Sequence, residues 1–155
     1  MNQFKKVLVA VDFSENSEYA FNYALDLSKQ FGGELTIVHV LNEPANLVGF
    51  YIPNSVVFEQ LNKEVEEGAS SKMENFCSAN MGDFKNYKTS IVSGHPYEEI
   101  IRKANETDAS LIVMGTHGRT GIEHLIFGST AERVVRSASC PVLTIRLPVE
   151  HHKFL

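Results

Sequence analysis

The glycine-rich stretch GTHGRTGIEHLIFGST, residues 115–130, contains the residue types and spacing in this chain that could do chemistry. It follows the apolar run 111–114 and holds four glycines in sixteen residues. Glycine costs roughly 0.5–1 kcal/mol inside a regular element, so such a cluster needs a geometric or chemical reason. A strand that leads through a glycine-rich loop into a helix start is the general layout of a phosphate site, because backbone N–H groups and the helix dipole attract an anion there. We therefore predict that this stretch binds phosphate groups.

The common catalytic versions of such a site are absent from the sequence. There is no GxxxxGK[ST] motif, so no P-loop lysine, and no GxGxxG motif. No nucleophile elbow or paired-carboxylate spacing is present either. Without a lysine to neutralise charge on a γ-phosphoryl group and without an evident base, we expect a site that holds a nucleotide and hydrolyses it slowly at most.

Composition excludes several other classes of protein. The chain has 155 residues and a net charge of -5, and no Lys/Arg block exceeds a pair such as Lys5-Lys6, so a nucleic-acid partner is not expected. Apolar runs such as 7–11 are too short for a signal peptide or a membrane span, so we expect a cytoplasmic protein without membrane insertion. Cys77 and Cys140 lie far apart and are expected to be buried free thiols.

The elements that must position the glycine-rich stretch alternate along the chain. Apolar β-branched runs predict strands at 6–11, 35–41, 87–92, 111–114 and 141–147, and three- and four-residue spacing predicts helices at 14–31, 56–80, from 96 and at 129–139, with a long loop at 42–55. This alternation predicts one doubly wound α/β domain over 1–155, a five-stranded parallel sheet with helices on both faces and strand order 3-2-1-4-5. Ligands bind where strand order reverses, so Asp12 and Gly115 should face one crevice.

The helix patterns also predict which side chains are buried. The inward-facing residues are Ala20, Phe21, Ala24, Leu25, Ser28 and Phe31 in the first helix, Phe58, Leu61, Val65, Ala69, Met73 and Phe76 in the second, and Ile100, Ile101 and Ala104 in the third.

The spacing Gly115-x2-Gly118-x9-Gly128-Ser129 resembles the nucleotide-binding branch of the universal stress protein family, which carries G-x2-G-x9-G-[ST] between the fourth strand and the fourth helix. Five segments resemble the family in order: KVLVAVDFS (6–14), IVHVL (37–41), SGHPYEEIIRKA (93–104), DASLIVMGTHGRTG (108–121) and SCPVLTI (139–145). The resemblance covers nearly the whole chain except 42–90 and 149–155.

The resemblance implies an ATP site and assigns its residues. Asp12 would contact the ribose or the metal-bound phosphates. The base would meet the backbone of Val40, with Ala10 and Val11 lining its pocket. Met114, Gly115, His117 and Gly118 would flank the ribose and first phosphates, and Gly128, Ser129 and Thr130 would hold the outer phosphates. Mg²⁺ or Mn²⁺ would accompany the phosphates.

Other interpretations of several residues stay open. Ser129 and Glu132 have the spacing of a capping box, and either Asp12 or Ser14 could cap the first helix. Gly118 and Gly128 are required either because the ligand comes close or because their φ angles are positive. His39 fits a core or edge histidine, His95 a helix start, and Arg119 and His124 a solvated loop face.

Three functions follow from these features. The first is an ATP-binding sensor or regulator read by an unknown downstream protein. The second is a slow ATPase or a nucleotide-transferring enzyme, and the third is a nucleotide-free stress-response dimer. The strand Pro141 to Leu147 is predicted to lie at a sheet edge, because Pro141 cannot donate to a ladder and only Arg146 and Pro148 protect the edge. Family members usually pair this strand with its twofold mate, so the resemblance implies a homodimer with Val142 and Thr144 near the axis.

Overall fold

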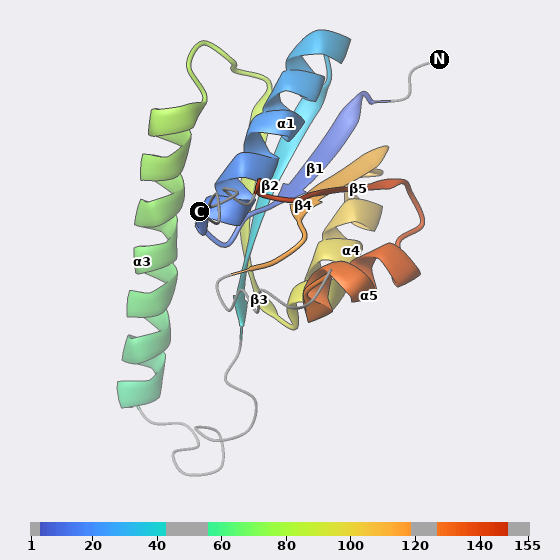
Figure 1. Ribbon diagram of the computed structural model, residues 1–155. Helices are drawn as coiled ribbons and strands as arrows, with labels where there is room; N and C mark the ends of the chain where they lie inside the picture. Colours follow the sequence, from blue (N-terminus) through green and yellow to red (C-terminus); the bar gives the residue numbers. More distant parts are fainter. Residues whose placement is uncertain (1–3, 43–55, 119–126, 149–155) are drawn as a thin grey trace, which may run out of the picture.

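The computed structural model describes residues 4–42, 56–118 and 127–148 and contains the predicted doubly wound sheet (Figure 1). The strands are β1 (Lys6–Ala10), β2 (Glu34–Asn42), β3 (Tyr87–Gly94), β4 (Leu111–Gly115) and β5 (Val142–Ile145). The helices are α1 (Glu15–Phe31), α3 (Val56–Asn80), α4 (Pro96–Glu106) and α5 (Ser129–Ser137). Neighbouring strands are parallel and the order is β3-β2-β1-β4-β5, as predicted. The predicted loop lies, from residue 43 on, outside the described residues.

Helices cover both faces of the sheet. Figure 1 shows α1 and α3 on one side and α4 and α5 on the other. Alternate residues of a strand point to opposite faces, so Val7 and Val9 pack in the core under α1 and α3, while Leu8 packs under α4 and α5. Both faces are thus apolar, which explains why the central strands read as continuous apolar runs instead of alternating ones.

The ends of α1 are fixed by local chemistry. Ser14 is the N-cap, and its Oγ accepts the N–H of Ser17 at 3.3 Å, so Ser14 and not Asp12 caps this helix. Gly32 closes the helix in the left-handed conformation at φ 59°, which glycine adopts without a Cβ penalty. At Gly33 a Cβ would lie 2.5 Å from the Phe4 carbonyl oxygen, so only glycine fits between α1 and β2.

The prediction for α3 is right in its second half, whereas in its first half Phe58 is only half-buried and two other predicted side chains are exposed. Ala69, Met73 and Phe76 are buried, but Leu61 is 51% exposed and Val65 48%. The reason is length: 25 residues of helix span roughly 38 Å, whereas the 9 residues of β2 span roughly 30 Å. In Figure 1 the first turns of α3 extend past the end of β2.

Two further side chains differ from the predicted faces. Phe31, at the end of α1, is 40% exposed and meets only the edge of the Phe4 ring, at 5.1 Å between centroids. Ile101 is half-buried, whereas Ile100 and Ala104 on the same helix are buried. Consecutive helical residues lie about 100° apart, so the narrow inner face of α4 includes Ile100 and leaves Ile101 at its border.

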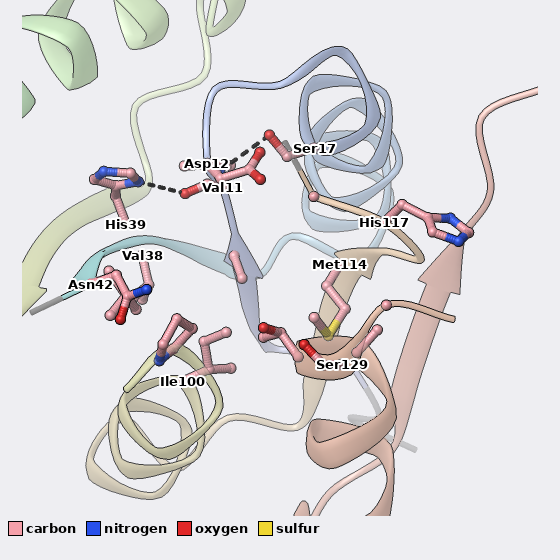
Figure 2. A pocket seen from close by; sticks show the side chains of 18 of the residues that line it. Val11, Asp12, Ser17, Val38, His39, Asn42, Ile100, Met114, His117 and Ser129 are labelled. Atoms are coloured by element: carbon pink, nitrogen blue, oxygen red, sulfur yellow. Dashed lines mark hydrogen bonds between the residues drawn. The ribbon is translucent and has the colours of Figure 1, made fainter. Parts of the chain in front are cut away.

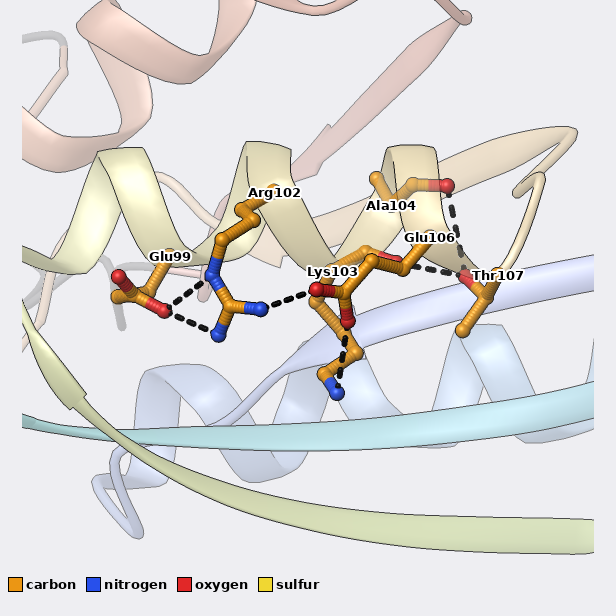
Figure 3. Close-up of polar contacts among 6 residues, drawn as sticks. All are labelled: Glu99, Arg102, Lys103, Ala104, Glu106 and Thr107. Atoms are coloured by element: carbon orange, nitrogen blue, oxygen red, sulfur yellow. Dashed lines mark hydrogen bonds and ion pairs between the residues drawn. The ribbon is translucent and has the colours of Figure 1, made fainter.

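The outer face of α4 is charged (Figure 3). Arg102 donates from Nε to Glu99 at 2.8 Å and is also paired with Glu106, which accepts from Lys103 at 3.2 Å. The hydrogen bond from Lys103 holds the pKa of Glu106 below its usual range. Exposed ion pairs of this kind stabilise a helix only weakly. The charged side chains make the outer face of α4 polar, while its inner face packs on the sheet.

Two expectations from composition are tested by the structure. Cys77 is buried and Cys140 is half-buried, both are free, and burial raises the pKa of both thiols. Among the described residues, no helix combines the length and the apolar character that crossing a membrane requires.

Candidate functional site

A pocket of about 540 Å³ lies beyond the carboxyl ends of β1, β2 and β4, beside the starts of α4 and α5 (Figure 2). This volume is within the roughly 300–1,000 Å³ typical of small-molecule sites. The structure brings all the predicted site residues to it: Ala10, Val11, Asp12, Val40, Met114, Gly115, His117, Gly118, Gly128, Ser129 and Thr130. The pocket lies where strand order reverses between β1 and β4, so Asp12 and Gly115 do face one crevice. Contact with a nucleotide stays a prediction.

Sequence reasoning missed a second group of lining residues: Ser17, Val38, His39, Leu41, Asn42, Pro96, Ile100, Thr116 and Ala131. Most come from the end of β2 and the start of α4, far in sequence from the glycine-rich stretch. They reach the pocket because β1 lies between β2 and β4. The available signal was position, since the carboxyl end of each inner strand of a parallel sheet borders the same crevice.

The glycines of the motif are sites of close approach. A Cβ at Gly118 would lie 2.7 Å from Asp12 Oδ2, which is closer than atoms pack. The N–H of Gly128 donates to the Thr116 carbonyl oxygen at 2.7 Å, and a Cβ there would lie 3.2 Å from that oxygen. Gly118 therefore places the loop against the end of β1, and Gly128 ties the start of α5 to the end of β4.

The expectation that these glycines need a positive φ is wrong. Gly128 has φ -71°, and the described glycines with positive φ are Gly32, Gly82 and Gly94. Gly118 is not among them. A side chain is thus excluded here by the atoms that it would meet, and the backbone conformation itself would tolerate one.

The carboxylate of Asp12 is held in place from its own strand end. Asp12 Oδ1 accepts the backbone N–H of Ser14 at 3.0 Å and also the Ser14 hydroxyl. The N–H of Asp12 donates to Ser17 Oγ at 3.2 Å, a bond drawn in Figure 2. These bonds fix the carboxylate with Oδ2 toward Gly118. An oriented carboxylate oxygen is an acceptor for ribose hydroxyls and a ligand for a hard cation.

The start of α5 shows that the capping-box interpretation of Ser129 is wrong. The N-cap is Gly128, whose carbonyl oxygen accepts the Glu132 N–H at 3.1 Å, and no side chain of the described residues caps the helix. Ser129 is therefore the first helical residue, and Glu132 pairs instead with Arg136 at 2.9 Å. The hydroxyls of Ser129 and Thr130 line the pocket beside the first N–H groups of α5, which have no acceptor within a helix.

His39 and His95 have the structural roles that the sequence suggested, a buried histidine and a helix start. His39 is 7% exposed and its Nδ1 lies 2.8 Å from the Val11 carbonyl oxygen, so it is a buried histidine, and it belongs to the pocket lining. His95 is the N-cap of α4 and precedes Pro96 at the first helical position, as expected for a helix start. His117 contacts Thr116 Oγ1 through Nδ1 at 3.0 Å. Arg119 and His124 lie outside the described residues.

Phe13, next to Asp12, is held in a conformation that its type disfavours. Its φ is 64°, which costs an L-residue with a Cβ roughly 1–2 kcal/mol. Its ring packs on His39 at 4.5 Å and on Phe76 at 5.7 Å between centroids. Packing against these two rings offsets the backbone strain and fixes the turn that orients Asp12.

This strain leads to a stability prediction. We expect Phe13→Ala to lower the free energy of unfolding by about 2–3 kcal/mol through lost packing. We expect Phe13→Gly to be more stable than Phe13→Ala by about 1 kcal/mol, because glycine relieves the positive φ. Urea unfolding measures both.

Phe21, buried within α1, supplies the control: there the glycine variant should be about 1 kcal/mol less stable than the alanine variant. If the glycine variant were less stable than the alanine variant at Phe13 as well as at Phe21, the strain at Phe13 would be contradicted.

The pocket combines an apolar part with a polar part. Val38, Val40, Ile100 and Met114 provide an apolar wall suited to a flat ring system, while backbone N–H groups, hydroxyls and the Asp12 carboxylate lie around the glycine motif. None of the described residues that line this pocket is a lysine or arginine. No group of three His, Cys, Asp or Glu side chains in the described part of the chain could hold a metal ion, so a cation would need ligand oxygens as well as Asp12.

Comparison with known proteins agrees with these features. The sequence model of the universal stress protein family matches residues 3–146. The universal stress protein MJ0531 of Methanocaldococcus jannaschii is 34% identical over 148 residues, which cover 95% of this chain and 85% of that protein.

Solved structures show the same fold. The protein MJ0577 of the same organism superposes with a TM-score of 0.81 at 29% identity, covering 95% of this chain and 99% of that one. A universal stress protein from Archaeoglobus fulgidus, solved in complex with dAMP, superposes with a TM-score of 0.56 at 24% identity, covering 92% and 98%. At that identity the second likeness extends to the fold alone.

Proposed function

Because the chain belongs to the universal stress protein family, we propose that it is a cytoplasmic ATP-binding regulator whose liganded state is read by another protein. The observation that supports this most is the close approach of two segments that are distant in sequence. Asp12 Oδ2 lies only 2.7 Å from the position that a Cβ at Gly118 would occupy. The motif that resembles a nucleotide site thus meets the end of β1 across one pocket.

In the proposed complex the adenine lies against Ala10, Val11 and the backbone of Val40, and Asp12 accepts a hydrogen bond from the ribose. The phosphates follow Met114 and the glycine motif to Ser129 and Thr130, where helix N–H groups donate to them. Mg²⁺ or Mn²⁺ would accompany the phosphates and would neutralise charge that the lining residues leave uncompensated. Asp12 is the carboxylate of the described lining residues that could help to hold the ion.

Titration calorimetry with ATP and Mg²⁺ tests this proposal, with mass spectrometry of nucleotide that co-purifies with the protein. We expect one ATP per chain and a dissociation constant well below millimolar, because the pocket is preformed. No heat of binding at millimolar ATP would refute the proposal and would favour the nucleotide-free dimer instead.

Turnover is expected to be slow. The described lining residues include no lysine or arginine to stabilise charge on a transferred phosphoryl group, and such groups carry much of the catalysis in phosphoryl transfer. We expect hydrolysis far below the typical enzyme rate of about 10 per second. Released phosphate should be measured at saturating ATP and Mg²⁺ on protein freed of contaminating ATPase. A rate near 10 per second would assign the protein to the enzymes instead.

We also propose that the chain, acting as a single domain, forms a homodimer through the edge of β5. The carbonyl oxygens of Pro141 and Ile145 accept hydrogen bonds from the N–H groups of Ile112 and Thr116, each at 3.0 Å. The backbone N–H and C=O groups of the odd-numbered residues of β5 therefore point toward β4. Backbone groups alternate in direction along a strand, so the N–H and C=O of Val142 and Thr144 face the edge of the sheet. The observed strand is shorter than predicted, Val142–Ile145, and still contains both of these residues.

A further inference from the structure

We propose that a second pocket, beside the proposed nucleotide pocket, takes the terminal phosphate of a polyphosphate nucleotide, and that Arg133 makes the protein prefer ATP over AMP. The inference rests on the proposed function. It concerns how the site distinguishes ATP from AMP, since the described lining of the first pocket includes no lysine or arginine that would respond to the number of phosphates.

The second pocket adjoins the first at the start of α5. It has a volume of about 210 Å³ and is lined by Asn42, His95, Pro96, Tyr97, Ser129, Thr130 and Arg133. Asn42, Pro96, Ser129 and Thr130 line both pockets. A group bound at the two hydroxyl side chains therefore lies at the boundary, and a chain of phosphates that continues past it enters the second pocket.

Arg133 is placed to meet that group. It follows Ser129 by four residues and Thr130 by three, so the three side chains lie on one face of α5. Its guanidinium lies over the Tyr97 ring, 5.0 Å from the centroid, and Tyr97 is itself tied to Glu98 by a 2.9 Å hydrogen bond. Stacking on an aromatic ring orients an arginine while leaving its N–H donors available.

The charges around Arg133 favour an anionic ligand. Arg136 on the same helix pairs with Glu132 at 2.9 Å and Arg102 pairs with two glutamates, but no carboxylate of the described residues pairs with Arg133. Arg133 is also the one arginine or lysine among the described residues that line either pocket. The phosphates of ATP need positive charge, and a guanidinium binds phosphate oxygens through two parallel hydrogen bonds.

The number of phosphates then decides the contact. The single phosphate of AMP lies at the first phosphate position, near Met114 and the glycine motif, and does not reach the second pocket. A triphosphate does, and gains the charge-assisted bonds of Arg133. Arg133 is thus a specificity residue for the terminal phosphate and has little effect on the base, ribose or first phosphate.

Calorimetry on Arg133→Gln tests this, with ATP and AMP as separate ligands and Arg136→Gln as the matched control. We expect Arg133→Gln to weaken ATP about ten-fold or more and AMP less than about two-fold, since one charge-assisted pair is lost only with the longer ligand. Arg136→Gln, one turn further along the exposed face of α5, should leave both affinities unchanged. Equal loss for ATP and AMP, or no loss for either, would overturn the inference.

Inorganic triphosphate separates this inference from the proposed function. If the wild type binds neither nucleotide, the proposed function fails. Binding of triphosphate to the wild type but not to Arg133→Gln would then still support an anion site at the second pocket. If triphosphate also binds both proteins equally or neither, the inference fails too.

Discussion

Gly118→Val is expected to lower the affinity for ATP at least about 100-fold, equivalent to roughly 2.7 kcal/mol, while the protein stays folded. The Cβ alone would lie 2.7 Å from Asp12 Oδ2, so the carboxylate or the loop must move. Either movement separates the proposed ribose contact from the phosphate positions, and the two valine methyl groups then occupy ligand space. Gly118 lies outside the buried core of the sheet, so the cost falls on binding more than on folding.

Calorimetry measures the affinity, and thermal unfolding followed by circular dichroism checks that the variant is folded. Gly68→Val is the matched control, because a Cβ at Gly68 in α3 has no atom within 4 Å and the position is remote from the pocket. It should bind ATP as the parent does. If Gly118→Val binds ATP like this control, the glycine-rich stretch is a structural turn and the proposed site is misplaced.

Thr144→Pro is expected to convert the proposed dimer into a monomer of 17.3 kDa. The N–H of Thr144 points to the edge of the sheet, so proline removes a donor to the twofold mate without removing a bond to β4. The proline ring also blocks the close approach of a second strand. Because Leu143 and Ile145 still pack in the core, the protomer should remain folded.

Sedimentation velocity at micromolar concentration measures the change. Thr144→Val serves as the control, because valine keeps the N–H and a β-branched shape and should leave the dimer intact. A wild type that sediments only as a monomer would disprove the edge dimer. A Thr144→Pro variant that remains dimeric would place the interface elsewhere.

The fold could be predicted because local and global signals agree. The central strands are continuous β-branched runs, since both of their faces are buried. Helix α1 follows the cap Ser14 and ends at Gly32, and α4 begins at Pro96. Right-handed crossovers leave only a few topologies for this order of elements, and β3-β2-β1-β4-β5 is one of them. The carboxyl ends of the strands then had to face one crevice, so the predicted residues converge on one pocket.

The predictions that were wrong or missing concern residues whose conformation depends on contacts with other parts of the chain. Ser129 has the spacing of a capping residue, but the hydrogen bond between Gly128 and Thr116 places the N-cap one residue earlier. Phe13 carries no sequence signal of a positive φ, because its conformation is stabilised by His39 and Phe76 from other elements. The second pocket was not predicted for the same reason, since Tyr97 and Arg133 meet only when α4 and α5 pack side by side.

We expect the first half of helix α3 to open on its own in the native protein. Its second half is anchored by Met73 and Phe76, so amide hydrogens there should exchange with solvent only when the whole sheet unfolds. Its first half exposes Val56 and Leu61, 80% and 51% accessible, and little burial holds those turns to the sheet. Amides of the first half should therefore exchange orders of magnitude faster than those of the second half. A protease added to the native protein would cut within these first turns well before it cut any strand.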